Sequence, residues 1–251
     1  MSFGWLNILS KYKILVCFIM ILFIIGAQLP EVPSTEPVLD EIVLKLKEMR
    51  DPTVSVQTHR GSGSGTIINI INTDMKDIFE YHVLTNAHVT HSRFFTYLRG
   101  VDSITGKIQI ETIDTGCIVT TFDHPNKTCE YHNTKVIAEN IVHDLAILSF
   151  VSDQKFNVAK IANNDMLEQI RVFDEVFAIG CQLGRNPTPT VGIVSQILTG
   201  THGEQEWILY GSTAQITPGS SGGGLFKRYD DHYYLIGVPY SLAVANNGQF
   251  I

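Results

Sequence analysis

Hydrophobic and polar residues alternate at short intervals over most of the chain, a pattern typical of β-strands. Runs of β-branched and aromatic residues are separated by glycine, asparagine and aspartate, without long helical segments between them. Because strands without crossover helices pair antiparallel and must dispose of their edges, we expect barrels or a sandwich. Residues 52–251 are too many for one small barrel and fit two packed barrels. The predicted strands are residues 53–59, 65–71, 81–86, 107–113, 117–122, 145–150, 175–180, 191–197, 206–211 and 233–238.

The amino terminus has a different pattern, which predicts a membrane-targeting segment. Every residue from 14 to 27 is apolar or glycine, and Lys11 and Lys13 precede the run. This length suits a cleaved signal peptide, because a membrane span needs about 17–25 residues. Ile25 stands where a cleavage site needs a small residue, which favours an uncleaved anchor. Residues 1–29 are therefore a cytoplasmic tip with an anchor or a signal peptide, and both alternatives stay open.

Residues 30–51 connect this segment to the strand-rich region. Pro30, Pro33 and Pro37 predict a stiff, extended stalk. Residues 38–50 carry apolar side chains at helical spacing, with acidic residues early and basic residues late, which predicts a short amphipathic helix. The lysines before the apolar run place the following residues on the exported side, periplasmic or extracellular, or secreted if the signal is cleaved.

Composition and charge exclude several classes of protein. With 44% apolar and 17% charged residues, the chain is globular rather than disordered or collagenous. Its 18 basic and 25 acidic residues lack the basic excess of a nucleic-acid-binding protein. The four cysteines form no C-x-x-C pair, so neither a zinc ribbon nor a thioredoxin-type site is expected. Cys117 and Cys129 either pair in an oxidising compartment or stay free, and the sequence leaves this open.

The sharpest chemical signal is the sequence G-x-S-G-G at residues 219–223. A nucleophilic serine needs nearby backbone N–H groups to stabilise the oxyanion of a tetrahedral intermediate. A glycine two residues before the serine lets the main chain turn so that two amides converge. This register selects Ser221 over Ser220 as the nucleophile, with the amides of Gly219 and Ser221 as oxyanion donors.

A serine nucleophile also needs a base and a carboxylate that orients it. His88 directly follows a predicted strand and a Thr-Asn turn, and Asp144 stands at the start of another apolar strand. A carboxylate there is costly unless hydrogen bonds hold it. His88 and His91 do not form an H-E-x-x-H motif, and near a strand end they are not expected to share a face, so we expect no metal and no other cofactor.

With these motifs in place, the chain resembles trypsin-like serine proteases of the HtrA/Deg type. The match runs in order through VLTNAHV, HDLAIL, FAIGCQLG, VGIVSQI and TAQITPGSSGGGLF, and covers about residues 52–244. The resemblance implies an all-β domain of two packed six-stranded antiparallel β-barrels over residues 52–251. Barrel one would span about 52–155 and barrel two about 165–245, with the active site between them.

The resemblance also assigns roles to residues. Ser221 would attack the scissile carbonyl, His88 would take and return the proton, and Asp144 would orient the imidazole. Without a carboxylate in the segments that border the primary pocket, we expect a preference for small or medium aliphatic residues. The pocket residues implied are Gln215, Ile216, Pro239, Tyr240, Ser241 and Leu242.

Some positions depart from the family pattern. Ser220 replaces the usual asparagine, Gly224 replaces proline or alanine, and Gln182 replaces a proline in the loop after a predicted strand. The residues after Ser221 are too few for a PDZ domain, so we expect none. The predicted function is a serine endopeptidase acting on exported proteins or peptides, with a homotrimer implied by the family. The alternative is a catalytically silent, membrane-tethered peptide-binding module with the same fold.

Overall fold

The computed structural model describes residues 36–122, 128–202 and 205–240. The apolar segment at residues 14–27 and the stalk up to residue 35 lie outside the described residues. Within the described ranges, no helix combines the length and the apolar character needed to cross a bilayer. Helix α2 (Glu36–Lys45) continues into a π-helical turn, η1 (Leu46–Arg50), and ends before Pro52. The predicted helix at residues 38–50 is therefore confirmed, and it begins two residues earlier.

The first sheet contains seven strands in the spatial order β7-β6-β1-β2-β3-β9-β8, and all its neighbours pair antiparallel. Its core is built from the inward-facing residues of these strands, among them Val54, Val83 and Leu148. The strands are β1 (Thr53–Thr58), β2 (Gly61–Asn72), β3 (Phe79–Thr85), β6 (Ile118–Phe122), β7 (Thr128–Tyr131), β8 (Lys135–Asn140) and β9 (Leu145–Ser152).

The second sheet contains six strands in the order β10-β15-β14-β11-β12-β13. Five of them pair antiparallel, and the short β10 runs parallel to β15. A short helix, α4 (Asn164–Glu168), precedes β11, and a 3-10 turn, η2 (Gln182–Gly184), follows it. The strands are β10 (Lys160–Ile161), β11 (Glu175–Gly180), β12 (Thr188–His202), β13 (Gln205–Ser212), β14 (Gly224–Tyr229) and β15 (His232–Gly237).

A buried apolar cluster joins the two sheets. Phe177, Ile179 and Phe226 of the second sheet pack together, with Ile68 and Leu84 of the first sheet against them. Met49 of the η1 turn is 2% exposed and belongs to the same cluster. The η1 turn is thereby held on the strand-rich body, and the two sheets are fixed relative to each other.

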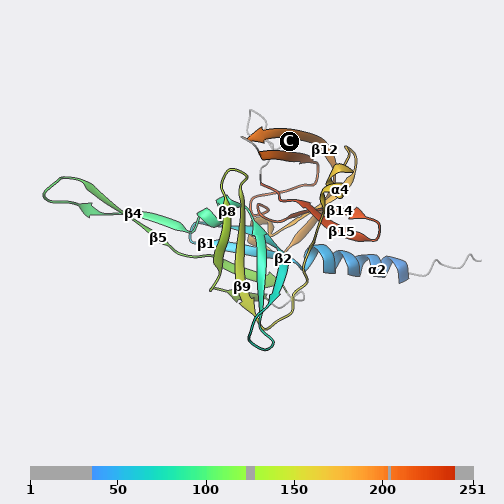
Figure 1. The fold of residues 1–251 in the computed structure, drawn as a ribbon, viewed down its shortest axis with the longest axis horizontal. Coiled ribbons are helices and arrows are strands. Elements are labelled where there is room, and N and C mark those ends of the chain that lie inside the picture. The colour runs from blue at the N-terminus through green and yellow to red at the C-terminus, as the bar shows by residue number, and fades with distance from the viewer. Residues whose placement is uncertain (1–35, 123–127, 203–204, 241–251) are drawn as a thin grey trace, which may run out of the picture. The chain divides into compact units, whose positions relative to one another are not determined.

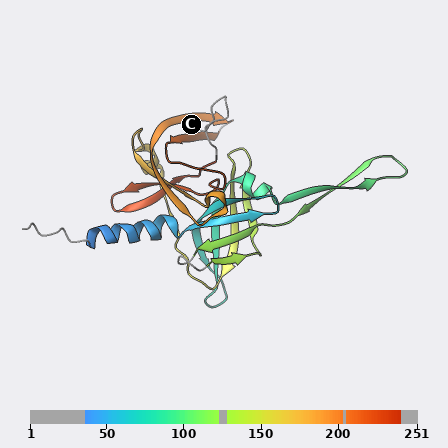
Figure 2. The ribbon, with the colours of Figure 1, turned by 180° about the vertical axis from the view of Figure 1, so that it is seen from behind.

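A two-stranded ribbon projects from the body and is built by β4 (Phe94–Val101) and β5 (Ile108–Asp114). Figures 1 and 2 show it extending away from both sheets. Its outer part leaves large apolar side chains in solvent, such as Leu98 at 62% exposure and Ile110 at 66%. The helix α3 (Ala87–His91) directly precedes the ribbon in the chain.

The all-β prediction is confirmed, and each of the ten predicted strands is present. The strand count differs in detail, because the first sheet has seven strands rather than six and the second includes one parallel pair. Cys117 and Cys129 both have free thiols, so the unpaired alternative is the one found.

Candidate active site

The short helix α3 carries His88 and starts where β3 ends. Asn86 has extended backbone angles at the cap position of this helix, and its side-chain amide donates to the Asp144 carbonyl at 2.8 Å. His91 also lies on α3, three residues after His88, so the expectation that these two histidines would not share a face was wrong. The ring of His91 contacts Phe94 edge-on. Over the described residues, no three potential metal ligands gather at one point.

Asp144 holds His88 at two points. Its Oδ2 lies 2.7 Å from the imidazole Nδ1, and its Oδ1 accepts the His88 backbone N–H at 2.8 Å. Asp144 has a φ of 52°, a left-handed conformation that aspartate tolerates better than most residues. Because Nδ1 is bound to the carboxylate, Nε2 is the ring nitrogen that remains available to accept a proton. The structure thus brings together two of the three residues predicted for a triad.

In the loop with Ser221, some backbone N–H groups donate hydrogen bonds within the protein and others do not. The N–H groups of Ser220, Gly222 and Gly223 donate to backbone carbonyls at 2.9, 3.1 and 3.0 Å. By contrast, the N–H groups of Gly219 and Ser221 have no acceptor within the described part of the chain. These are the two amides that the sequence predicts as oxyanion donors.

The orientation of the Gly219 amide follows from its neighbour. The Pro218 carbonyl accepts a hydrogen bond from the Leu183 N–H at 2.8 Å. In a trans peptide the carbonyl and the N–H point in opposite directions, so the Gly219 N–H points away from Leu183. Gly219 has a φ of +95°, and a Cβ there would lie 2.7 Å from the Cys181 carbonyl oxygen, so glycine is needed here.

Ser64 on β2 holds this loop from the other sheet, and the sequence analysis did not identify it. Its N–H donates to the Ser221 carbonyl at 2.7 Å, and its hydroxyl donates to the Gly219 carbonyl at 2.5 Å. The same hydroxyl accepts the Cys181 N–H at 2.7 Å. Ser64 is fully buried. The available signal was the G-S-G-S-G run at residues 61–65, whose small residues permit close backbone approach.

The Ser221 loop lies against the elements that carry His88. A Cβ on Gly63 would meet both the Val89 side chain, at 2.6 Å, and the Ser221 carbonyl oxygen, at 2.9 Å. Between the described side chains of His88 and Ser221, no hydrogen bond is formed. Such bonds are often long in enzymes without substrate and tighten in the complex. The structure therefore places Ser221 beside the histidine helix without joining the hydroxyl to the imidazole.

The predicted pocket residues lie on two segments. Ile216 packs against the core of the second sheet, whereas Gln215 is exposed. Pro239 accepts the Gly222 N–H through its carbonyl, and Tyr240 is 47% exposed. The remaining two predicted pocket residues, Ser241 and Leu242, lie outside the described residues.

Gln182, which stands where the family pattern has proline, bridges the η2 turn to one of the pocket segments. Its amide nitrogen donates to the Gln215 carbonyl at 3.4 Å, and its amide oxygen accepts from the Thr217 hydroxyl at 3.3 Å. Leu183 follows with a φ of 53°, and its N–H donates to the Pro218 carbonyl. The η2 turn thus supports the loop with Ser221, although the turn lacks the proline of the family pattern.

Comparison with known proteins relates the chain to a family of peptidases. A family model described as "Trypsin-like peptidase domain" matches residues 63–238. Serine protease Do-like HtrA of Bacillus subtilis (strain 168) is 29% identical over 180 residues, which cover 69% of this chain and 32% of the relative. Serine protease Do-like HtrB of the same organism is 32% identical over 126 residues, which cover 47% and 26%. The chain thus matches about a third and about a quarter of the lengths of these relatives.

Solved structures show the same fold. Deg5 is similar with a TM-score of 0.57 and 21% sequence identity, over 84% of this chain and 88% of that chain. The HtrA-type protease AlgW with a tripeptide gives a TM-score of 0.53 at 22% identity, over 82% and 56%. At this level of identity the likeness concerns the fold alone. The trypsin-like fold expected from the sequence is therefore confirmed.

Proposed function

Since the chain belongs to the trypsin-like peptidase family, with HtrA-type serine proteases among its relatives, we propose that it is a serine endopeptidase with Ser221, His88 and Asp144 as its catalytic triad. His88 Nε2 would accept the proton of the Ser221 hydroxyl as the oxygen attacks the scissile carbonyl. The imidazolium would then protonate the leaving amine, which releases the first product and leaves an acyl-enzyme. Water would then attack the acyl-enzyme carbonyl while His88 takes its proton, and the imidazolium would return a proton to the Ser221 oxygen as the acid product leaves.

Asp144 supports this mechanism through its two contacts with His88. The carboxylate at 2.7 Å from Nδ1 favours the tautomer with a free Nε2 and stabilises the imidazolium formed during the reaction. Its second contact, with the His88 backbone N–H, limits rotation of the whole residue. Together these contacts direct the base without taking part in the proton transfer.

The observation that carries the proposal is the pair of unused amides at Gly219 and Ser221. A developing oxyanion needs preorganised donors that are not already bonded to the protein. The Leu183 N–H fixes the Pro218 carbonyl, so the Gly219 N–H of the same peptide unit points away from Leu183. A binding module without turnover has no need of this arrangement, so the observation favours the enzyme over the silent alternative.

The test compares the full-length chain, purified in detergent, with single variants in hydrolysis of a fluorogenic casein. Ser221→Ala and His88→Ala should lower kcat on the order of 10⁶, which brings the rate to background. Asp144→Asn should lower kcat about 10⁴, and the left-handed backbone should accept asparagine. A fluorophosphonate should label the parent at Ser221. A parent protein that is folded but neither labelled nor active would be a silent binding module.

We also propose that the enzyme prefers small or medium aliphatic residues at the position before the scissile bond. Support comes from the described pocket residues, Gln215, Ile216, Pro239 and Tyr240, which include no carboxylate to pair with lysine or arginine. A peptide library digested by the parent protein should give products that end in alanine, valine or leucine. Strict cleavage after arginine would contradict this specificity.

For location, we propose a membrane-anchored protein whose peptidase domain acts on exported proteins. The support is the apolar run at residues 14–27 with Lys11 and Lys13 before it. Intact mass measurement of protein isolated from membranes should show residues 1–29 still attached. A mature protein that begins shortly after residue 27 would instead indicate a cleaved signal peptide.

A further inference from the structure

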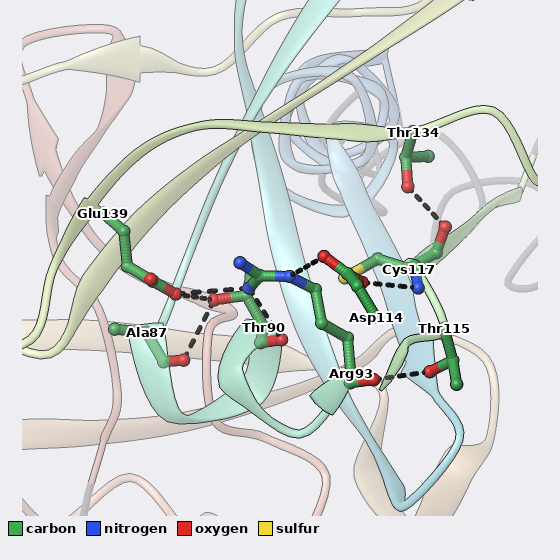
Figure 3. A network of polar contacts seen from close by, with 9 residues as sticks. Ala87, Thr90, Arg93, Asp114, Thr115, Cys117, Thr134 and Glu139 are labelled. Carbon is green, nitrogen blue, oxygen red and sulfur yellow. Dashed lines mark hydrogen bonds and ion pairs between the residues drawn. The ribbon is translucent and has the colours of Figure 1, made fainter. Parts of the chain in front are cut away.

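Arg93 follows helix α3 by two residues and is the centre of a network of polar contacts (Figure 3). Its side chain is only 11% exposed. Its Nη1 donates to the Thr90 carbonyl in the last turn of α3 at 3.0 Å and lies 3.5 Å from Glu139 Oε1. Its Nε donates to Asp114 Oδ2 at 3.1 Å. A single guanidinium therefore contacts the helix of His88 and two carboxylates from other strands.

The first set of contacts fastens the carboxyl end of α3 to the first sheet. Glu139 on β8 accepts the Thr90 hydroxyl at 2.7 Å and also pairs with Arg93. A helix of five residues is not stable by itself, because nucleation is costly and few intrahelical bonds form. A cation that binds a terminal carbonyl also complements the helix dipole. The position of α3 thus depends on its buried residues, on these side chains at one end and on Asp144 at the other.

The second set of contacts joins Arg93 to both ends of the β4–β5 ribbon where it meets the body. Asp114 is the last residue of β5, and Arg93 directly precedes β4. The Arg93 carbonyl accepts the Thr115 N–H at 3.0 Å and the Thr115 hydroxyl at 2.6 Å. The guanidinium also lies over the Phe94 ring, 4.1 Å from its centre. The base of the ribbon and the helix of His88 therefore share one residue.

We propose that Arg93 is a positioning residue for His88, and this inference rests on the proposed function of the site. Asp144 holds the imidazole near the amino end of α3. Arg93 holds the carboxyl end of the helix through Thr90 and Glu139. Without Arg93 the carboxyl end of the helix keeps the Glu139 bond to the Thr90 hydroxyl but loses the guanidinium bond to the Thr90 carbonyl, so the imidazole samples orientations in which Nε2 misses the Ser221 hydroxyl. Among the described residues predicted to bind substrate, none contacts Arg93, so its loss should lower kcat and leave KM unchanged.

The kinetic test uses Arg93→Ala and Arg93→Lys, with Arg99→Ala as the matched control. Arg99 lies on the outer ribbon, is 68% exposed and pairs with Glu111 at 3.6 Å, so its removal deletes a similar ion pair far from α3. Arg93→Ala should lower kcat about 10- to 100-fold, because small misplacements of a catalytic group are costly. Arg93→Lys should recover part of this loss, since it keeps the charge but not the forked geometry. Arg99→Ala should stay within twofold of the parent.

Two milder variants test the network if Arg93→Ala does not fold. Asp114→Asn removes the negative charge that faces Arg93 from the ribbon, and Glu139→Gln removes the one that faces it from β8. Each should lower kcat less than Arg93→Ala, with KM unchanged. Thermal unfolding of every variant shows whether the fold is intact. Folded variants with parental kcat would overturn the positioning role.

A spectroscopic measurement separates this inference from the proposed function. Nitrogen-15 spectra of the imidazoles are recorded in a Ser221→Ala background, where turnover plays no part. The His88 signals should be sharp with Arg93 present or with Arg99→Ala, and broadened or shifted with Arg93→Lys. If the parent protein proves inactive, the proposed function fails and these spectra alone decide the positioning role. Identical His88 signals in all variants would overturn it.

Discussion

The backbone carbonyl of Ser221 accepts a 2.7 Å hydrogen bond from the backbone amide of Ser64. Ser64 lies on β2 of the first sheet, whereas Ser221 lies between β13 and β14 of the second. The carbonyl of Ser64 in turn accepts the Thr85 hydroxyl at 2.6 Å, at the end of the strand that leads to His88. The nucleophile proposed here and its base are thus connected through one residue of β2.

Replacement of Ser64 by alanine should impair both activity and stability. The variant loses the donor to the Gly219 carbonyl and the acceptor of the Cys181 N–H in a fully buried position. We expect kcat to fall about 10- to 100-fold and the free energy of unfolding to fall by about 1–3 kcal/mol. Casein hydrolysis and urea denaturation measure the two effects. Ser62→Ala is the control, because Ser62 is exposed in the same run, and it should change neither quantity.

Gly222→Ala should disrupt both the backbone of the loop and its reactivity. Gly222 has a φ of +86°, and a Cβ there would lie 2.1 Å from the Ser64 carbonyl oxygen and 2.2 Å from the Thr85 hydroxyl. The backbone strain alone costs about 1–3 kcal/mol, and the overlap forces the loop away from β2. We expect loss of fluorophosphonate labelling and a lower melting temperature. Gly61→Ala, where a Cβ would meet nothing within 4 Å, should keep both at the parental level.

Stability should depend on pH through Glu48 in the η1 turn. Its carboxylate accepts hydrogen bonds from Lys160 at 2.7 Å, His232 at 2.8 Å and the Tyr233 N–H at 2.9 Å. Burial by itself raises the pKa of Glu48, but these bonds and the charge of Lys160 outweigh it and lower the pKa. A lowered pKa contributes stability above the value of the unfolded chain, and this contribution is lost as the pH falls through the folded value.

The free energy of unfolding of the parent should therefore decrease below pH about 4.3. Glu48→Gln should lower it by about 1–3 kcal/mol at pH 7 and flatten the acid dependence. The control is Glu130→Gln, because Glu130 forms a similar pair with His132 but is 57% exposed. Its effect should stay below about 1 kcal/mol. If the free energy of unfolding fell equally with acid in the parent and in Glu48→Gln, Glu48 would not be the source of the pH dependence.

The three cysteines in the described part of the chain should differ sharply in reactivity. Burial raises the pKa of the Cys117 thiol to about 11 and that of Cys181 to about 12. At pH 8 only roughly one in 10³ and one in 10⁴ of these thiols is the reactive thiolate. Iodoacetamide should therefore modify the half-buried Cys129 first, as peptide mass spectrometry can show. In urea the three rates should converge, and equal rates in the folded protein would contradict this burial.

The sequence predicted the ten strands with strong apolar alternation and missed the five without it. β14 begins within a glycine run, and β7 and β8 carry polar and charged residues on exposed positions, so neither period nor composition distinguishes them from loops. β4 is apolar but lies directly after the histidine turn, and β10 spans two residues. These strands form because they pair with the edges of neighbouring strands, and the local pattern of apolar residues does not indicate such pairing.

Some residues of the proposed site could likewise be predicted from the sequence, and others could not. His88 was found because it follows an apolar strand, and Asp144 because it precedes one. In the structure, His88 Nδ1 lies 2.7 Å from Asp144 Oδ2. Ser64 and Arg93 were missed because their roles come from partners distant in sequence, such as Gly219 and Glu139. A serine in a glycine run and an arginine after a helix are ordinary surface residues until the fold buries them.

The Leu183 hydrogen bond to the Pro218 carbonyl has a consequence for the time course of hydrolysis. A peptidase that first had to rotate this peptide unit would show a lag before product accumulates. In the proposed mechanism the Gly219 N–H, which points away from Leu183, needs no such rotation, so the progress curve should be linear from the moment of mixing. Latency would then have to be imposed from outside, by limiting which polypeptides reach Ser221, rather than by a dormant conformation of the loop.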